Sequence, residues 1–348
     1  MTPSPRQLAV VAAAGSHKTE YIVNQALAYS DRRVLLTTYT LNNLACIQQR
    51  IYQKVGHLPA HITLMSWYGF LMHHWCRPYQ RAILGAPGVI RGVDFKSQRP
   101  RWVGEANARQ YFCTPAGHLY KDRVADFAVK VNAAADGAAV RRLQELYEEV
   151  YIDEVQDLAY YDLGILEGLL HSGMHVIAVG DLRQHTYATN QNTKDKKYRG
   201  ASIADWLSNY SDVCDIEYRT TSYRCNQEIC DFADALYPNL PATTSANLDV
   251  VTPSGILMIK KADLPAHISA HNPIVLRHDM RTRTFGVPAI NFGAAKGMTA
   301  EHVVIFTTGD IRRYLETKNP EVLKGVTRSK LYVAITRARH SVAFVSPG

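Results

Sequence analysis

The sequence contains only six cysteines, and their spacing does not indicate a zinc site or a redox-active pair. They stand at positions 46, 76, 113, 214, 225 and 230, and no two of them form a C-x-x-C motif. Scattered cysteines are typical of a protein in a reducing compartment. His73, His74 and Cys76 lie close together, but their spacing matches no familiar zinc site. We therefore expect reduced thiols and no metal at these residues.

The sequence also lacks an apolar run long enough to span a membrane. Residues 8–15 are apolar enough to resemble the core of a signal peptide, but no convincing cleavage site follows them. A first core strand is the better interpretation of this segment. We expect a cytoplasmic protein that does not bind membranes.

Negative charge is scarce in one part of the chain. The 348 residues carry 39 Lys or Arg and 31 Asp or Glu, which gives a net charge of +8. Residues 77–130 hold ten Lys or Arg and four Asp or Glu, so this segment contributes 10 − 4 = +6. Such a basic segment favours a polyanionic partner, most commonly nucleic acid, and a basic surface without a partner is the alternative.

Local sequence signals repeat in the order strand, loop, helix. In the first part of the chain we expect strands at 8–14, 33–40, 62–66, 150–153 and 175–180, and helices at 18–29, 42–55, 67–75, 121–135, 138–149 and 161–171. In the second part we expect strands at 214–221, 255–261, 274–277, 302–308 and 341–345, and helices at 226–236 and 328–338. This alternation predicts an α/β protein with parallel sheets covered on both faces.

Two adjacent carboxylates follow a strand-like run at residues 150–157, which read V-Y-I-D-E-V-Q-D. The carboxyl edge of a parallel strand faces the crevice in which α/β proteins bind ligands. There, one of the two carboxylates, Asp153 or Glu154, can hold Mg²⁺ and the other can polarise a water. A strand followed by a solvated acidic turn is the alternative for this pair alone.

A second candidate element is the small-residue loop A-A-A-G-S-H-K-T at residues 12–19. Backbone N–H groups of such a loop, between a strand and a helix, converge on phosphates. Lys18 would neutralise the phosphates and the Thr19 hydroxyl would ligate Mg²⁺. Because Ala12 and His17 stand at both glycine positions of the strict P-loop pattern, an ordinary turn is the alternative.

Three further segments fit a nucleotide site in chain order. V-G-D-L-R-Q at residues 179–184 places Gln184 at the end of a strand, where its amide would sense the γ-phosphate. Arg224 and Arg337 lie in the second part of the chain. An arginine delivered from another domain stabilises charge on a transferring phosphoryl group.

These segments resemble the superfamily 1 DNA helicases of the UvrD/Rep type. The matching stretches, from about residue 8 to residue 345, are A-A-A-G-S-H-K-T, T-T-Y-T-L-N-N, D-E-V-Q-D, G-D-L-R-Q-H-T-Y, S-Y-R-C-N, A-K-G-M-T-A-E-H-V-V and L-Y-V-A-I-T-R-A-R. The resemblance implies two RecA-like domains with ATP and Mg²⁺ between them. We expect an ATP-binding domain at 1–212, with a small, mostly helical basic insertion at about 77–149, and a second RecA-like domain at 213–348.

The resemblance also implies roles for individual residues. Glu154 would be the catalytic base, Gln184 the γ-phosphate sensor, and Arg224 and Arg337 the arginine fingers. Thr19 and Asp153 would hold the metal. The nucleotide-binding set is Gly15, Ser16, His17, Lys18, Thr19, Lys296 and Gly297. Thr38, Tyr39 and Ser66 would contact single-stranded DNA and Tyr187 would stack on a base, with core packing or an idle surface as the alternative for each tyrosine.

The chain departs from the family pattern at several positions. Gln7 is too close to the phosphate loop to read adenine comfortably, and Thr299 replaces a frequent glutamate. The roughly 70 residues between Arg224 and Lys296 are too few for the large second accessory domain of family members. His17 replaces the glycine that lets the loop wrap closely around phosphates.

The sequence therefore predicts a compact ATP-dependent DNA translocase or helicase that moves on single-stranded DNA, with 3′ to 5′ polarity implied by the resemblance. The short length, the missing accessory domain and His17 leave one alternative from another class. This alternative is a non-unwinding, nucleotide-dependent subunit that regulates a partner nuclease, for example in phage defence.

Overall fold

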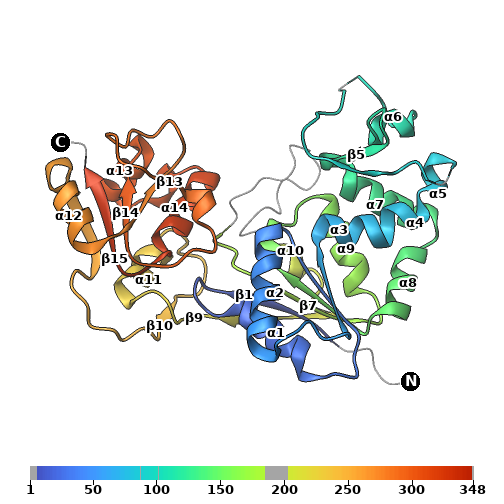
Figure 1. The fold of residues 1–348 in the computed structure, drawn as a ribbon, viewed down its shortest axis with the longest axis horizontal. Coiled ribbons are helices and arrows are strands. Elements are labelled where there is room, and N and C mark those ends of the chain that lie inside the picture. The colour runs from blue at the N-terminus through green and yellow to red at the C-terminus, as the bar shows by residue number, and fades with distance from the viewer. Residues whose placement is uncertain (1–5, 87, 101, 185–202, 347–348) are drawn as a thin grey trace. The chain divides into compact units, whose positions relative to one another are not determined.

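The computed structural model describes residues 6–86, 88–100, 102–184 and 203–346, and it contains two parallel sheets with helices on both faces (Figure 1). Contacts group the described residues into two compact units. Among the described residues, the first unit holds 6–10, 19–86, 88–100, 102–180 and 203–217, and the second holds 11–18, 181–184 and 218–346. The predicted α/β class with two parallel sheets is confirmed.

The first sheet has six strands in the order β3-β2-β6-β7-β1-β8. Their bounds are β1 Gln7–Ala12, β2 Val34–Thr38, β3 Ile62–Ser66, β6 Glu149–Asp153, β7 His175–Gly180 and β8 Cys214–Arg219. Strands β2 and β6 are buried along their whole length, as expected for inner strands of a covered sheet. In the register, Thr38 at the end of β2 lies between Ser66 on β3 and Asp153 on β6.

The helices of the first unit are α1 Lys18–Ala28, α2 Leu41–Val55, α3 Trp67–Leu71, α9 Tyr161–Leu170 and α10 Ile203–Ser208. Helix α2 shows why these elements begin and end where they do. The Thr40 hydroxyl accepts a hydrogen bond from the Asn43 N–H (3.1 Å), and Gly56 ends the helix with a positive φ of 79°. Helix α3 continues into a π-helical turn at Met72–Cys76.

The basic insertion packs onto this unit through helix α7. It contains α4 Arg77–Tyr79, α5 Arg81–Leu84, α6 Ala108–Phe112, α7 Val124–Ala134, α8 Ala138–Leu146 and a two-stranded parallel sheet of β4 Gly92–Asp94 and β5 His118–Tyr120. Helix α7 contacts α9 and the π-helical turn. Helix α8 ends three residues earlier than predicted, because Tyr147 takes an extended backbone and Glu149 already belongs to β6.

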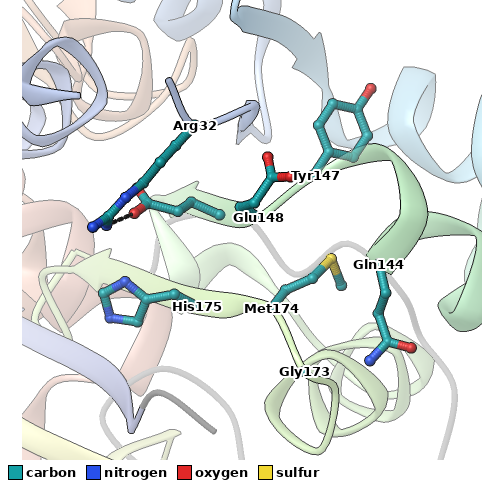
Figure 2. A pocket seen from close by; sticks show the side chains of 8 residues that line it. Arg32, Gln144, Tyr147, Glu148, Gly173, Met174 and His175 are labelled. Carbon is teal, nitrogen blue, oxygen red and sulfur yellow. Dashed lines mark hydrogen bonds and ion pairs between the residues drawn. The ribbon is translucent and has the colours of Figure 1, made fainter. Parts of the chain in front are cut away.

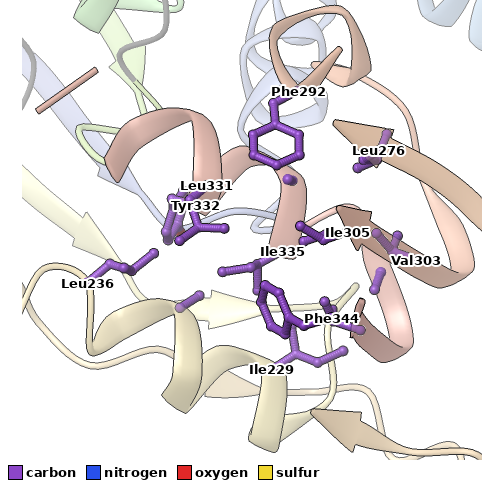
Figure 3. Packing of buried hydrophobic residues seen from close by; sticks show 14 of the residues in the cluster. Ile229, Leu236, Leu276, Phe292, Val303, Ile305, Leu331, Tyr332, Ile335 and Phe344 are labelled. Atoms are coloured by element: carbon purple, nitrogen blue, oxygen red, sulfur yellow. The ribbon is translucent and has the colours of Figure 1, made fainter. Parts of the chain in front are cut away.

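The second unit is built on a five-stranded sheet in the order β11-β15-β14-β12-β13. Its strands are β11 Gly255–Lys260, β12 Ile274–Arg277, β13 Ile290–Asn291, β14 Ala300–Phe306 and β15 Ala338–Ser346, and its helices are α11 Gln227–Asp234, α12 Leu264–His271, α13 Gly309–Thr317 and α14 Gly325–Ile335. Figure 3 shows Ile229 of α11 and Ile335 of α14 in one core with Val303, Ile305 and Phe344 of the sheet. The short strands β9 Thr221–Ser222 and β10 Thr244–Ser245 pair beside α11.

The assignment of one strand and the presence of several helices also differ from the sequence predictions. The strand at Cys214 is predicted with the second set of strands, which is wrong: β8 joins the first sheet beside β1. Its largely exposed side chains are those of an edge strand, and a local pattern does not specify which sheet an edge strand joins. Helices α12 and α13 are not predicted at all. Among the described residues no helix is both long and apolar enough to cross a bilayer.

Candidate nucleotide site and nucleic-acid edge

The acidic pair Asp153 and Glu154 lies at the carboxyl end of β6. Asp153 contacts the first turn of α1. The Thr19 hydroxyl donates a hydrogen bond to Asp153 Oδ2 (3.1 Å). The other carboxylate oxygen, Asp153 Oδ1, accepts the Glu154 N–H at 3.0 Å. Asp153 is buried, with 3% of its surface exposed. Two oxygen ligands predicted for Mg²⁺ therefore lie side by side at the carboxyl edge of the first sheet.

Glu154 is held in a left-handed backbone conformation. Its φ is 60° and its ψ is 46°, values that a residue with a Cβ adopts only at a cost. The Gln156 amide donates a hydrogen bond to Glu154 Oε2. Strain of this kind is found at functional sites, where the surrounding structure holds it in place.

Gly180 at the end of β7 leaves the space that the acidic loop occupies. A Cβ on Gly180 would stand 2.3 Å from Gln156 Oε1 and 3.2 Å from the Val155 nitrogen. A side chain at this position would therefore have to displace the buried Gln156 amide group, which bonds Glu154. Gln156 and Gly180 are further functional candidates; both lie within the motifs D-E-V-Q-D and V-G-D-L-R-Q, but the motifs alone predict no role for them.

The phosphate-loop segment, residues 11–18, packs against residues 222–225 within the second unit. Gly15 has a φ of 79°, and its carbonyl accepts the Tyr223 N–H at 3.0 Å. A Cβ at Gly15 would stand 2.7 Å from Arg224 Cβ. Ser16 is buried, and its hydroxyl has no hydrogen-bond partner among the residues that the structure describes. An orphaned hydroxyl in a loop between a strand and a helix fits a phosphate ligand.

His17 takes the positive φ that the missing glycine would adopt freely. Its φ is 59°, and its imidazole stacks on the ring of Tyr223 with centroids 4.6 Å apart and planes 13° apart. The side chain is exposed. Lys18, the first residue of α1, is half-buried. Histidine is therefore compatible with the loop geometry, and the stack supplies a contact that glycine would not make.

Gln184 lies in a buried polar group with Asp181, just after β7. The Gln184 amide donates to Asp181 Oδ2 at 2.7 Å, and the backbone N–H of Arg183 donates to Asp181 Oδ1 at 3.1 Å. The Arg183 guanidinium lies 3.3 Å from Asp234. Burial alone would lower the pKa of Arg183, but Tyr332, Asp181 and Asp234 raise it overall. Arg183 therefore stays charged and anchors this segment.

The two predicted arginine fingers both contact the end of α14. Arg224 donates to the Thr336 carbonyl at 3.0 Å. Arg337 is 2% exposed and donates to the carbonyls of Val333 (2.9 Å) and Met298 (3.3 Å). Met298 follows Lys296 and Gly297, which are half-buried and exposed, respectively. Arg224, Arg337 and the predicted nucleotide-contact segment at Lys296 thus lie close together within the second unit.

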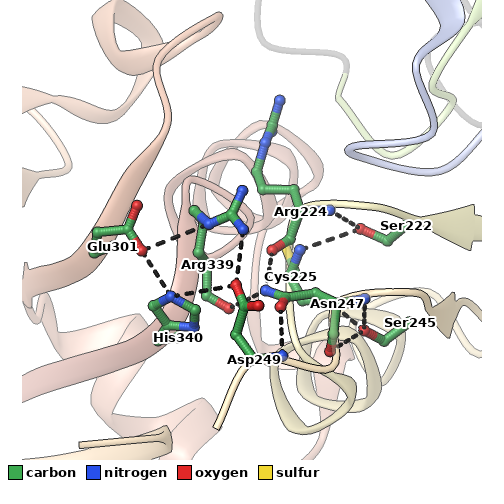
Figure 4. Close-up of polar contacts among 9 residues, drawn as sticks. All are labelled: Ser222, Arg224, Cys225, Ser245, Asn247, Asp249, Glu301, Arg339 and His340. Atoms are coloured by element: carbon green, nitrogen blue, oxygen red, sulfur yellow. Dashed lines mark hydrogen bonds and ion pairs between the residues drawn. The ribbon is translucent and has the colours of Figure 1, made fainter. Parts of the chain in front are cut away.

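Asn247 joins the two arginine-bearing segments. Its amide donates to the Arg224 carbonyl (2.7 Å) and to the Arg339 carbonyl (3.3 Å). Figure 4 shows the surrounding network, in which Asp249 and Glu301 both contact Arg339 and His340. Asn247 lies outside the quoted motifs, so the sequence offers no signal for its role.

Tyr332 on α14 is a further candidate whose role the sequence does not predict. Its hydroxyl accepts the Ala14 N–H at 3.4 Å, so it links α14 to the phosphate-loop segment. Burial raises the pKa of its phenol. The motif L-Y-V-A-I-T-R-A-R contains this tyrosine, but the contact depends on tertiary structure.

Of the residues predicted to touch nucleic acid, Thr38 and Ser66 end β2 and β3, and Tyr39 follows β2. Thr38 is 1% exposed, and no described residue forms a hydrogen bond with its hydroxyl. The Ser66 hydroxyl accepts the Gly69 N–H (3.2 Å) and so caps α3. The Tyr39 hydroxyl lies 2.8 Å from the Tyr68 hydroxyl. Tyr187 lies outside the described residues.

Figure 2 shows a cavity at the opposite, amino edge of the first sheet. Its volume is about 420 Å³, and its lining includes Arg32, Glu149, Met174 and His175. Arg32 forms an ion pair with Glu149 there. Gln7 also lies at this edge. Its side chain donates a hydrogen bond to the Met174 carbonyl and accepts one from the Val176 N–H. Ligand sites of parallel sheets lie at the carboxyl edge, so this cavity is separate from the predicted nucleotide site.

Comparison with known proteins identifies the family. The model of the viral superfamily 1 RNA helicase core domain matches residues 114–346, about two thirds of the chain. The chain belongs to this family. The match includes Asp153, Glu154, Gln184, Arg224 and Arg337, whereas the phosphate loop precedes it.

Solved helicase structures are also similar to this superfamily 1 core. The crystal structure of Arterivirus nonstructural protein 10 (helicase) is 15% identical, with 98% of this chain and 59% of that chain covered and a TM-score of 0.49. The complex of that protein with DNA is 15% identical, with 98% and 61% covered and a TM-score of 0.48. The chain spans about three fifths of the length of these structures. No curated protein matches the sequence.

Proposed function

We propose that this superfamily 1 core is an ATP-dependent translocase or helicase that moves on single-stranded nucleic acid. The observation that carries the proposal is the hydrogen bond of 3.1 Å between Thr19 and Asp153. It joins the residue after Lys18 to the acidic end of β6, as a site for a metal–nucleotide complex requires. The orphaned Ser16 hydroxyl adds a donor for phosphate in the preceding loop.

The binding roles follow from the donor set. Gly15, Ser16, His17 and Lys18 would bind the phosphates of ATP, with Lys296 and Gly297 as further contacts. Thr19 and Asp153 would hold Mg²⁺, directly or through water, and few protein ligands suffice because Mg²⁺ usually keeps waters and substrate phosphates. The ion would neutralise charge on the phosphates.

The catalytic roles rest on groups that can move or stabilise charge. Glu154 would accept the proton of the attacking water, and Gln184 would sense the γ-phosphate. Arg224 and Arg337 would stabilise charge on the transferring phosphoryl group. Within this proposal, the ATP-binding RecA-like domain extends from residue 1 through β8, which belongs to the first sheet, and the residues after β8 form the second domain.

DNA is the substrate suggested by the resemblance to UvrD/Rep-type helicases, and RNA is the substrate named in the description of the matched family. Thr38, Tyr39, Ser66 and Tyr187 would contact the strand in either case. We propose single-stranded DNA and 3′ to 5′ movement, and the assay below includes RNA and both polarities.

The test measures ATP turnover by the purified chain with no polymer, with single-stranded DNA and with single-stranded RNA. Turnover should require Mg²⁺, increase with one polymer, and fall to background in Lys18→Ala and Glu154→Gln. Activity that survives both substitutions would overturn the assignment. Unwinding of duplexes with a 3′ or a 5′ single-stranded tail then determines polarity.

A regulatory subunit of a partner nuclease predicts a different result in the same experiments. The isolated chain would bind and hydrolyse ATP without displacing a strand. It would also form a stable complex with the protein encoded beside it, detected by gel filtration. Strand displacement by the isolated chain would exclude this alternative.

A further inference from the structure

A row of three aromatic rings runs from the end of β2 into the basic insertion. Tyr39 and Tyr68 have ring centroids 5.6 Å apart, and Tyr68 and Phe95 have centroids 5.3 Å apart in an edge-to-face arrangement. Tyr39 is a predicted nucleic-acid contact, whereas Tyr68 and Phe95 belong to no motif. All three lie within the first unit. The insertion is therefore connected, ring by ring, to the edge at which a strand is proposed to bind.

Phe95 has the exposure that a base-stacking residue needs. It is 58% exposed, although its ring also contacts Tyr68. Every nucleic-acid base has a π-face on which an exposed aromatic ring can stack. An exposed phenylalanine without a ligand would need no fixed orientation, whereas this ring is packed against a neighbour.

The backbone around Phe95 is fixed by Asp94. The carboxylate oxygen Asp94 Oδ1 accepts the N–H groups of Lys96 (2.8 Å) and Ser97 (3.0 Å). The hydrogen bonds from Ser97 and Lys96 lower the pKa of Asp94 to about 2, so the carboxylate stays charged. Asp94 is also the last residue of β4, which pairs with β5. Phe95 is thus presented on a constrained turn.

Tyr68 holds the middle of the row. Its hydroxyl lies 2.8 Å from the Tyr39 hydroxyl, so the two phenols share a hydrogen bond. Burial raises the pKa of Tyr68, and its phenol stays neutral at any ordinary pH. The hydrogen bond and the ring contact together orient Tyr39 and Phe95 relative to each other.

The positive charge beside Phe95 favours a negatively charged ligand. Lys96 is exposed next to Phe95, and the surrounding segment 77–130 carries ten basic and four acidic residues. A ligand with both flat rings and phosphates can stack on Phe95 and pair with the charge of Lys96. Single-stranded nucleic acid is such a ligand.

We propose that Phe95 is a base-stacking residue for single-stranded nucleic acid and that Tyr68 positions it, so that the insertion extends the strand-binding surface beyond Tyr39. Lys96 contacts the backbone phosphate beside the stacked base. This inference rests on the proposed function, because it assigns a further contact to the same nucleic-acid ligand.

The test compares the affinity of the full chain for a labelled oligothymidylate and for an abasic oligomer of equal length, by fluorescence anisotropy. Phe95→Ala should weaken oligothymidylate binding roughly 5- to 150-fold, the range expected for one lost stacking contact, and leave abasic binding unchanged. Phe95→Trp should retain affinity. Lys96→Ala should weaken both oligomers and reduce the salt dependence of binding, because it removes a phosphate contact.

Tyr52→Ala is the matched control, because Tyr52 is an exposed aromatic residue on α2, outside the row. It should bind both oligomers like the unaltered chain. Equal binding of oligothymidylate by Phe95→Ala and the unaltered chain would overturn this inference alone, and so would an equal loss on both oligomers. Failure of the unaltered chain to bind any single strand would overturn the proposed function as well.

Discussion

The imidazole of His17 lies nearly parallel to the ring of Tyr223, with ring centroids 4.6 Å apart. The contact joins the residue before Lys18 to the residue before Arg224. It forms at a backbone φ of 59°, where a Cβ is unfavourable. The stack therefore offsets part of the cost of replacing glycine, and it also restrains the loop that would bind phosphate.

His17→Gly should bind ATP several-fold more tightly than the unaltered chain. Glycine removes both the Cβ at a positive φ and the stack on Tyr223, so the loop is free to close around phosphates. His17→Phe keeps the ring and the Cβ and serves as the control, with little expected change. Nucleotide titration measures the affinities; weaker binding by His17→Gly would show that the stack supports the loop in its binding shape.

The sequence predicts the strands and helices around this site better than the tertiary contacts between its residues. Runs such as V-Y-I-D and H-V-I-A-V-G predict inner parallel strands because they are rich in β-branched, aromatic and other apolar residues, and β6 and β7 confirm them. Helix α12 is missed because its apolar residues do not form a clear stripe. The left-handed backbone of Glu154 and the Tyr332–Ala14 contact depend on tertiary packing, which no local pattern encodes.

Glu154→Gly should stabilise the chain by about 1 kcal/mol relative to Glu154→Gln, because only glycine adopts the left-handed conformation without steric cost. Neither variant should hydrolyse ATP, since both lack the carboxylate. Urea unfolding of the two variants, compared with each other, isolates the backbone effect from the loss of charge. Equal midpoints would mean that the strain at this position is negligible.

Gly180→Ala should greatly reduce ATP turnover, because its Cβ would stand 2.3 Å from Gln156 Oε1 and displace the loop that holds Glu154. The expected cost in stability is about 1–3 kcal/mol, as for other overpacked sites. Gly168→Ala on α9 is the control, since its Cβ would meet Val140 Cγ2 at an ordinary 3.6 Å. Thermal unfolding and ATP turnover are measured on both variants. Full activity in Gly180→Ala would show that the loop at Glu154 can shift without loss of function.

The stability of the chain should decrease as the pH falls from 6.5 to about 4, and His74 should account for much of the change. Burial, followed by the nearby His73 and Arg142, lowers the pKa of His74 from 6.5 to about 4. Arg142 approaches His74 Nδ1 at 3.2 Å, and a guanidinium only donates, so the ring must be neutral there.

The sign follows from proton binding. Below pH 6.5 the unfolded chain binds a proton at this histidine and the folded chain does not, so unfolding becomes more favourable until the folded pKa is reached. The loss from this one residue is at most about 3 kcal/mol. His74→Gln should flatten the dependence of the urea midpoint on pH across this window, whereas His57→Gln, at an exposed histidine, should not. An unchanged slope in His74→Gln would assign the acid sensitivity to other groups.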